Sequence, residues 1–460
     1  MKVSKKIPLG YKLVRLWVIF FHNNIYYKKV YNLHTENIPP KGTPLVVVSN
    51  HQNSLNDALG IVLSFDVRRP HFLARADIFK KSFIAKFLYY FGLLPVYRQR
   101  DGMENVKNNL HVFDTVEDIV HQGDTIVLYP EAGHQERHFL GRFFLSYTRI
   151  AFAAAERSNF EKEIFILPCA NHYNDYFNWR EELVINYGTP VSIKPFYELY
   201  KEQPRQAQIQ VNEIVQAQIE SLMLNIKDEE NYEAVYFLLQ TYGRKYSLHN
   251  GYNPDKLSEK LVMEQQLVSL LETEYQQHPE QTQDLYQRCL AYKTKLKELQ
   301  ISDATLNKPL SIVGLTFRFL AFVLGFPFFL HGFLHHIIQY IIPRFINKKV
   351  EDKMMHASIN IGVSAIVTFP LFYLLFFVLS LVFTHCFLVS FVYVMTLPLF
   401  GIIAWNYRKA FFDFMKRWRY YSLLKSNNEE LIEVLTLRDA IYKQMNLIAR
   451  SEERRVGKEC

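Results

Sequence analysis

Residues 357–407 contain no Asp, Glu, Lys or Arg, which constrains the fold of this chain more than any other feature. A helix that crosses the hydrocarbon core of a bilayer needs about 20 apolar residues, so this run has room for two. The run breaks near residues 384–386, and lysines and arginines flank it at 348–353 and 408–419. Because such residues are enriched in cytoplasmic loops, the pattern predicts a two-helix membrane hairpin with both ends in the cytoplasm.

Two further segments are candidates for membrane contact. Residues 310–342 are long enough to span but contain Arg318, Pro327 and three histidines, and a crossing here would place the front of the chain opposite the basic flanks. We therefore expect a re-entrant or interfacial segment. Residues 1–37 carry apolar residues at helical spacing with basic residues between them. That pattern favours a helix lying in the membrane surface, with a helix packed on the protein's own domain as the alternative.

The 460 residues are too many for one ordinary domain. Between residues 38 and 199 strand-like and helix-like stretches alternate, which predicts an α/β domain. Amphipathic helices are expected over 200–306, a membrane region over 307–420 and a helical tail over 421–449. Residues 450–460 resemble the conceptual translation of a sequencing-library adapter and are excluded from functional interpretation.

The formal net charge is +8, and its basic clusters lie beside the apolar segments. Such clusters indicate anionic lipid headgroups as partners rather than nucleic acid, for which the chain has no motif. The four cysteines lack the paired spacing of a disulfide framework or a zinc site. The sequence also contains no glycine-rich phosphate loop after a strand and no nucleophile elbow. We therefore expect neither a metal nor a cofactor.

An apolar strand over 45–48 leads into a polar turn with Asn50, His51 and Asp57. In open α/β sheets, ligands bind at the carboxyl ends of strands. His51 and Asp57 can meet if the histidine stays in the loop and Ser54 caps the next helix, with Asp57 in a capping-box-like position. Asp57 could then hold one ring nitrogen while the other takes a proton from a hydroxyl. Alternatively, Asp57 only satisfies backbone donors and His51 is an ordinary turn residue.

Three later blocks complete an ordered pattern: residues 92–98, residues 129–131 and residues 166–168. Together with His51 and Asp57 this pattern resembles that of the PlsC-like glycerolipid acyltransferases, over roughly residues 40–195. The resemblance is closer to the yeast-type glycerol-3-phosphate acyltransferase-like subset. It implies a mixed-sheet acyltransferase domain in which a histidine, oriented by an aspartate, is the general base of a one-step transfer from a thioester to a glycerol hydroxyl. An arginine and a glutamate of the second and third blocks would hold the glycerol phosphate.

Position by position, the resemblance implies the following roles: His51 as base, Asp57 as orienting acid, Pro168 in the fourth block, and Asn50, Arg98, Glu131 and Gly133 in substrate binding. Arg100 is an alternative to Arg98 as the phosphate ligand. The family usually has four residues between the histidine and the aspartate, and in this chain that spacing falls on Asn56. The yeast-type subset has five residues between them, which favours Asp57 as the orienting acid. Ala132 also separates Glu131 from the glycine that usually follows it.

The expected function is transfer of an acyl group to glycerol-3-phosphate or 1-acylglycerol-3-phosphate in phospholipid biosynthesis. Acyl-CoA or acyl carrier protein would be the acyl donor. Membrane lipids would be binding partners of the chain. The protein would be an integral membrane protein with its catalytic domain on the cytoplasmic face. The alternative is a non-catalytic lipid-binding or tethering module. Backbone donors near the helix start are expected to stabilise the oxyanion.

Overall fold

The computed structural model describes residues 7–65, 68–97, 109–131, 133, 136–307 and 309–459, with side chains described as far as Ser451. The chain divides into two compact units. Unit 1 comprises Met1–Asn225 and Phe345–Ala365, and unit 2 comprises Ile226–Arg344 and Ile366–Cys460. The α/β part thus extends beyond the expected limit at residue 199 and includes a segment from the apolar region.

Unit 1 is built on a mixed sheet, as the sequence predicts. Among the described residues it has eight strands in the order β1-β7-β6-β2-β5-β3-β4, with β8 paired to β6. The pairs β1/β7, β6/β2, β2/β5, β5/β3 and β3/β4 are parallel, whereas β7 and β8 run antiparallel to β6. The strands are β1 (Lys29–Leu33), β2 (Leu45–Ser49), β3 (His71–Arg75), β4 (Leu93–Val96), β5 (Thr125–Leu128), β6 (Phe165–Tyr173), β7 (Glu182–Tyr187) and β8 (Val191–Ser192). β1 therefore places part of the first 37 residues within the sheet.

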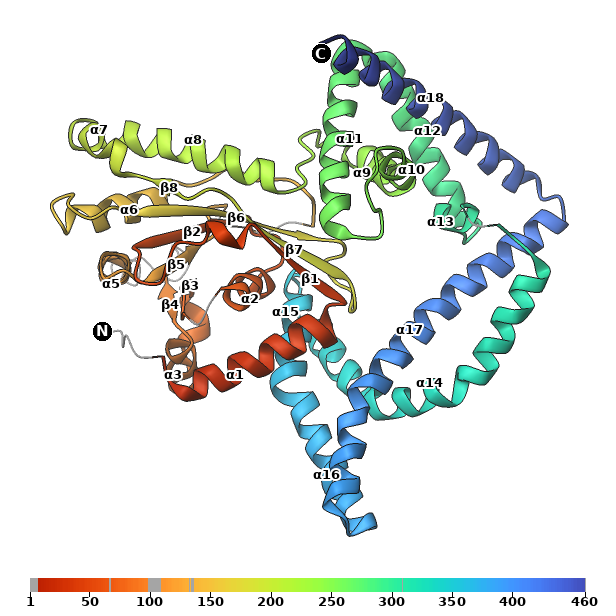
Figure 1. Cartoon of the computed structure of the whole chain (residues 1–460), viewed down its shortest axis with the longest axis horizontal. Helices are drawn as coiled ribbons and strands as arrows, with labels where there is room; N and C mark the ends of the chain where they lie inside the picture. The colour runs from red at the N-terminus through yellow and green to blue at the C-terminus, as the bar shows by residue number, and fades with distance from the viewer. Residues whose placement is uncertain are drawn as a thin grey trace. The chain divides into compact units, whose positions relative to one another are not determined.

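Strand β2 lies at the centre of this sheet and is buried along its whole length. Its three consecutive valines are β-branched, which suits an extended strand covered on both faces. One face packs against α5 (Asn109–His121), α6 (Ser146–Glu156) and α8 (Pro204–Leu222) around a single apolar core. On the other face, α2 (Leu55–Ser64) lies against the sheet, and α15 (Met355–Val363) packs on α2 (Figure 1).

The remaining helices of unit 1 are α1 (Leu9–Phe20), α3 (Ser82–Tyr90) and α7 (Tyr197–Glu202). Helix α1 exposes Leu9, Leu13 and Leu16, each more than half accessible, and buries Tyr11. Its apolar stripe therefore suits contact with a membrane surface. The Trp17 indole Nε1 donates to the carbonyl of Ala365 (2.7 Å), which attaches α1 to the segment that follows α15.

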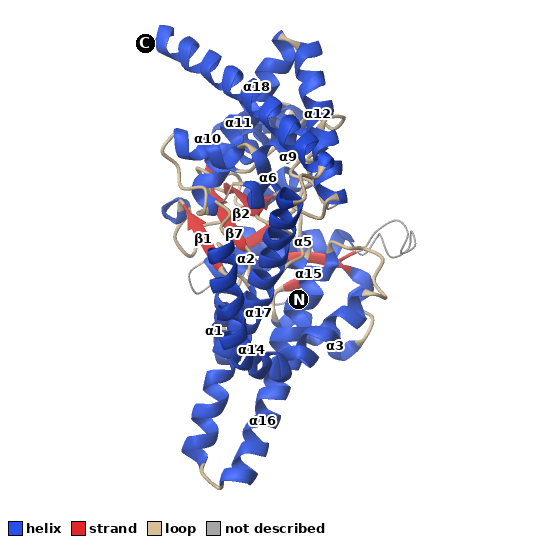
Figure 2. Ribbon diagram, turned by 90° about the vertical axis from the view of Figure 1, so that its right-hand side faces the viewer, coloured by secondary structure: helices blue, strands red, loops and turns tan. Residues whose placement is uncertain are grey.

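In the described residues unit 2 is helical, and the strands all belong to unit 1 (Figure 2). Its helices are α9 (Tyr232–Thr241), α10 (Gly243–His249), α11 (Leu257–Gln277), α12 (Pro279–Glu298), α13 (Asp303–Leu306), α14 (Ile312–Asn347, whose last residues belong to unit 1), α16 (Phe369–Thr384), α17 (Phe387–Lys425) and α18 (Glu429–Glu459). α18 packs against α11 and α12, and Arg438 pairs with Asp303 at 2.7 Å.

Three helical segments of the described chain are long and apolar enough to cross a membrane: Ile312–Asn347, Met355–Thr384 and Phe387–Lys425. The second joins α15 to α16 through a π-helical turn at residues 364–368. The first, expected to be re-entrant or interfacial, is one uninterrupted helix with Pro327 and Pro343 inside it. α14 and α17 approach closely at Gly332, where an added Cβ would lie 2.0 Å from the Phe400 carbonyl oxygen.

Candidate active site

The His51 ring contacts the Asp57 carboxylate, and both residues lie at the carboxyl end of the central strand. The histidine Nδ1 is 2.8 Å from Asp57 Oδ2. Asp57 is fully buried, whereas the His51 side chain is 20% exposed. The predicted contact is therefore present, and Asn56 does not make it, because its amide side chain bonds to the Tyr27 hydroxyl instead. With Nδ1 facing Asp57, Nε2 is the ring nitrogen that faces away from the carboxylate.

Asp57 is held by more than the histidine. Its Oδ2 also accepts from the backbone N–H groups of Gln52 (2.9 Å) and Asn53 (2.8 Å), and its Oδ1 accepts from the Tyr173 hydroxyl (2.6 Å). The residue also lies in the first turn of α2, where the helix dipole favours a negative charge. These contacts fix the carboxylate in one orientation beside the imidazole.

The expected cap at Ser54 is wrong in its details. Ser54 makes no side-chain cap hydrogen bond, and its backbone has φ 51° and ψ −126°, a conformation that non-glycine residues rarely adopt. The Asp57 carboxylate instead reaches past Ser54 to the N–H groups of residues 52 and 53. A serine cap would accept from the N–H of residue 56 or 57. The Asn56 N–H donates instead to the Asn53 carbonyl (3.0 Å) and to the Ser358 hydroxyl (3.3 Å).

Glu131 follows strand β5 and clamps the backbone of the histidine loop. Its Oε1 accepts from the His51 N–H (2.7 Å) and its Oε2 from the Gly141 N–H (2.7 Å). Burial raises the pKa of this carboxyl, and the two backbone N–H groups partly offset the rise. Both carboxylate oxygens therefore support the position of His51, in addition to any contact with a substrate.

Asn50 is buried and ties the loop to the neighbouring strand β6. Its Oδ1 accepts from the Asn171 N–H (2.8 Å), and its Nδ2 donates to the Asn171 carbonyl (2.9 Å). These two bonds pair its amide with the backbone of Asn171. The expected role in substrate binding stays a prediction. Asn50 fixes the start of the loop that carries His51.

Sequence reasoning missed three aromatic residues of the site. The Tyr129 ring stacks on His51 with centroids 4.3 Å apart and an interplanar angle of 19°. The Tyr173 hydroxyl bonds to Asp57, and the Tyr176 hydroxyl bonds to the Gln52 side chain (3.0 Å). Tyr129 was visible as the first residue of the third block, and Tyr173 stands a few residues after Pro168, but nothing local in the sequence indicates their partners.

The remaining predicted residues can be placed only in part. Arg98 and Arg100 lie outside the described residues, so the choice between them stays a prediction. Gly133 is described, and an added Cβ there would meet nothing within 4 Å. The expected oxyanion donors near the helix start are also restricted, because the N–H groups of His51, Gln52 and Asn53 already bond to Glu131 or Asp57.

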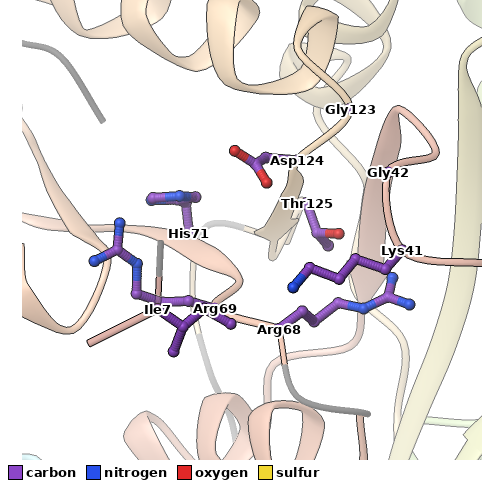
Figure 3. A pocket seen from close by; sticks show the side chains of 9 residues that line it. All are labelled: Ile7, Lys41, Gly42, Arg68, Arg69, His71, Gly123, Asp124 and Thr125. Atoms are coloured by element: carbon purple, nitrogen blue, oxygen red, sulfur yellow. The ribbon is translucent and has the colours of Figure 1, made fainter. Parts of the chain in front are cut away.

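A small cavity of about 30 Å³ lies at the amino end of the parallel strands, away from His51. Its lining includes Lys41, Arg68, Arg69 and His71, with Asp124 nearby (Figure 3). Arg68 is largely buried and donates to the Pro39 carbonyl (2.9 Å). Since β2 separates this cavity from the loop of His51, it does not belong to the candidate active site.

Comparison with known proteins finds similarity over the part of the chain that contains His51, Asp57 and Glu131. Residues 30–171 match the family model described as Acyltransferase. Glycerol-3-phosphate O-acyltransferase 2 of Saccharomyces cerevisiae is 25% identical over 140 residues, which are 30% of this chain and 18% of that protein. The crystal structure of the 1-acyl-sn-glycerophosphate (LPA) acyltransferase PlsC from Thermotoga maritima matches with 18% identity and a TM-score of 0.34, covering 46% of this chain and 78% of that one. The chain thus spans less than a fifth of the length of the yeast relative.

Proposed function

Since residues 30–171 form an acyltransferase domain, we propose that this chain transfers an acyl group from a thioester to a hydroxyl of a glycerol phosphate. The acceptor is glycerol-3-phosphate or 1-acylglycerol-3-phosphate, and the donor is acyl-CoA or acyl carrier protein. The observation that carries the proposal is the buried Asp57 carboxylate on Nδ1 of a partly exposed His51.

The chemistry follows from that pair. The acceptor hydroxyl gives its proton to His51 Nε2 as its oxygen attacks the thioester carbonyl. Asp57 stabilises the imidazolium that forms, because its carboxylate lies 2.8 Å from Nδ1. The attack forms the ester C–O bond and a tetrahedral intermediate, and collapse of that intermediate breaks the C–S bond. The departing thiolate then takes the proton from His51, which restores the neutral base.

A non-catalytic tethering module is the second candidate, because apolar helices make up much of the chain. Membranes containing the protein, given labelled acyl-CoA or acyl carrier protein with each acceptor in turn, separate the two. We expect ester formation with wild type and none with His51→Ala. Equal incorporation by both would refute catalysis by this site, and the better acceptor identifies the substrate.

Contacts within each unit suggest how the chain meets the membrane. Phe345–Ala365, the segment that directly follows most of α14, belongs to unit 1. Within it the Ser358 hydroxyl donates to the Asn53 carbonyl (3.3 Å) and accepts from the Asn56 N–H (3.3 Å). No candidate span lies among the described residues before α14. If unit 1 lies on one side of the bilayer, the chain must enter and leave α14 on that side.

The last helix, α18, also limits where the chain can leave the membrane. α18 packs in unit 2 on helices that precede α14, with Lys295 and Glu433 2.6 Å apart. The chain therefore returns to the starting side after α17, so α16 and α17 cross the bilayer as a hairpin and α14 enters it without crossing. Basic residues are enriched near both ends of the hairpin, and such residues are enriched in cytoplasmic loops. The side of the membrane from which the chain enters α14 is therefore the cytoplasm.

Two contacts support the shallow position of α14. Arg318 near its start lines one cavity with Arg417 of α17, and Tyr340 near its end packs on Trp405 with ring centroids 5.7 Å apart. Trp405 and Arg417 are twelve residues apart, or about 18 Å at 1.5 Å per residue. That separation is less than the roughly 30 Å of a hydrocarbon core. Both ends of α14 therefore lie beside the stretch of α17 from Trp405 to Arg417.

A further inference from the structure

A cavity of about 310 Å³ lies within unit 2 where the start of α14 meets the later part of α17. It is lined by Pro309, Leu310, Ser311, Gly314, Leu315, Arg318 and Arg417. Small-molecule sites in proteins begin at about 300 Å³, so the cavity can hold more than a few waters. It lies in a different unit from His51 and serves no step of the proposed reaction.

Arg417 is the cation built into this cavity. The residue is 9% exposed, and one guanidinium nitrogen donates to the Pro309 carbonyl (3.2 Å). Its Nε is buried and has no hydrogen-bond partner in the described part of the chain. Asp413, one turn earlier on α17, is exposed and offsets the charge only from a distance. A buried guanidinium N–H without an acceptor is costly, which indicates that an anion binds there.

A second cation and a helix terminus converge on the same cavity. Arg318 lines it from α14 and lies near enough to Arg417 for the two charges to repel. The cavity also includes the first turn of α14, a 36-residue helix whose amino end carries a partial positive charge. Two like charges beside a helix amino terminus are stabilised by a bound anion, and a guanidinium matches phosphate oxygens bidentately.

The surroundings favour a lipid as the source of that anion. Phe317, which precedes Arg318, is 69% exposed, and Trp418, which follows Arg417, is 46% exposed, so apolar side chains suited to acyl chains adjoin both arginines in sequence. Arg417 lies 30 residues after Phe387, the first residue of α17, or about 45 Å along the helix. A bilayer with its headgroup layers measures about 40–45 Å. When the start of α17 reaches the far surface, Arg417 lies at the near headgroup layer.

We propose that Arg318 and Arg417 bind the phosphate of an anionic lipid headgroup at the start of α14. The inference depends on the hairpin topology proposed above and not on the acyl transfer. Free phosphate offers the same chemistry, so the test must separate the two sources.

The test uses the full chain in phosphatidylcholine nanodiscs, titrated with bromine-labelled phosphatidate. Bromine quenches nearby tryptophan, and Trp418 follows Arg417 directly in the sequence. Bromine-labelled phosphatidylcholine and inorganic phosphate are the two comparison arms, and Trp418→Phe identifies the signal. The variants are Arg318→Gln, Arg417→Gln and the control Lys416→Gln, which removes the same charge from an exposed neighbour outside the cavity.

We expect phosphatidate to quench Trp418 saturably, and either arginine variant to weaken its binding about tenfold or more. Lys416→Gln should leave the affinity within about twofold, since an exposed lysine contributes only a diffuse charge. Arg318 is exposed, so its variant remains informative if Arg417→Gln fails to fold. Equal loss in all three variants, equal binding of phosphatidylcholine, or displacement of phosphatidate by low concentrations of inorganic phosphate would each overturn the lipid site. Loss of acyl transfer in His51→Ala with intact phosphatidate binding would leave the site standing.

Discussion

Asp57→Asn tests whether the charge of this buried residue, and not only its shape, supports His51. The asparagine carbonyl can still accept from His51 Nδ1 and from the N–H groups of residues 52 and 53. Its amide can face the Tyr173 hydroxyl, which can accept a hydrogen bond as well as donate one. The substitution should therefore preserve the loop and remove chiefly the negative charge.

The magnitude follows from Coulomb's law. An imidazolium and a carboxylate whose charges lie about 4 Å apart attract each other by about 4 kcal/mol at an effective dielectric constant of about 20. This attraction exists only once His51 has taken the proton, so its loss raises the barrier and not the cost of substrate binding. Each 1.36 kcal/mol changes a rate about tenfold, which predicts a fall in kcat of about a thousandfold with little change in KM.

The assay is steady-state acyl transfer with a labelled thioester and a saturating acceptor, at matched protein levels. Asp175→Asn is the matched control, because it makes the same substitution in a carboxylate that also accepts two backbone N–H groups, those of Phe177 (2.8 Å) and Asn178 (2.7 Å). Its kcat should stay within about threefold of wild type, since the charge-assisted hydrogen bonds that weaken join residues within 175–178. An Asp57→Asn enzyme that keeps a tenth or more of wild-type kcat would refute the role assigned to the charge.

Three further predictions concern other parts of the chain. Glu131→Gln removes one of two acceptors that hold the His51 and Gly141 N–H groups, so kcat should fall about ten- to a hundredfold; a rise in acceptor KM at constant kcat would instead show pure substrate binding. Burial lowers the pKa of His71 to about 4, so its neutral form supplies stability that is complete above pH 6.5 and lost as pH falls toward 4. In denaturant unfolding, wild type should therefore lose roughly 2 kcal/mol more of its unfolding free energy between pH 7 and pH 5 than His71→Gln does. Cys386 is exposed at the turn between α16 and α17, so an impermeant maleimide should label it only from the side opposite the catalytic domain, and labelling from the catalytic side would refute the hairpin.

The charge-free run at 357–407 could be identified as a membrane segment without a structure, because a membrane-spanning helix requires only enough length and apolar side chains. The α/β alternation and the contact between His51 and Asp57 were also predictable, since both residues lie within one loop and the first turn of one helix. The cap at Ser54 was predicted wrongly because propensity rules rank isolated side chains. Those rules do not include partners that are distant in the sequence, such as the Ser358 hydroxyl, which accepts from the Asn56 N–H.

The partners of that pair could not be predicted from the sequence. Glu131 lies 80 residues from His51 in the chain, and Tyr173 lies 116 residues from Asp57. They meet because β5 and β6 pair with the two edges of β2, and strand pairing depends on distant parts of the chain that local patterns do not encode.

The sequence by itself thus determined the chemical groups, their order, and the lengths of apolar chain that a membrane can accept. Only the tertiary structure decided which backbone donors are already used, which carboxylate supports the histidine loop, and that Arg318 and Arg417 share one cavity. The physical reason is the same in each case. Propensity and hydropathy act over a few neighbouring residues, whereas burial and hydrogen-bond partners depend on segments that meet only when the chain folds.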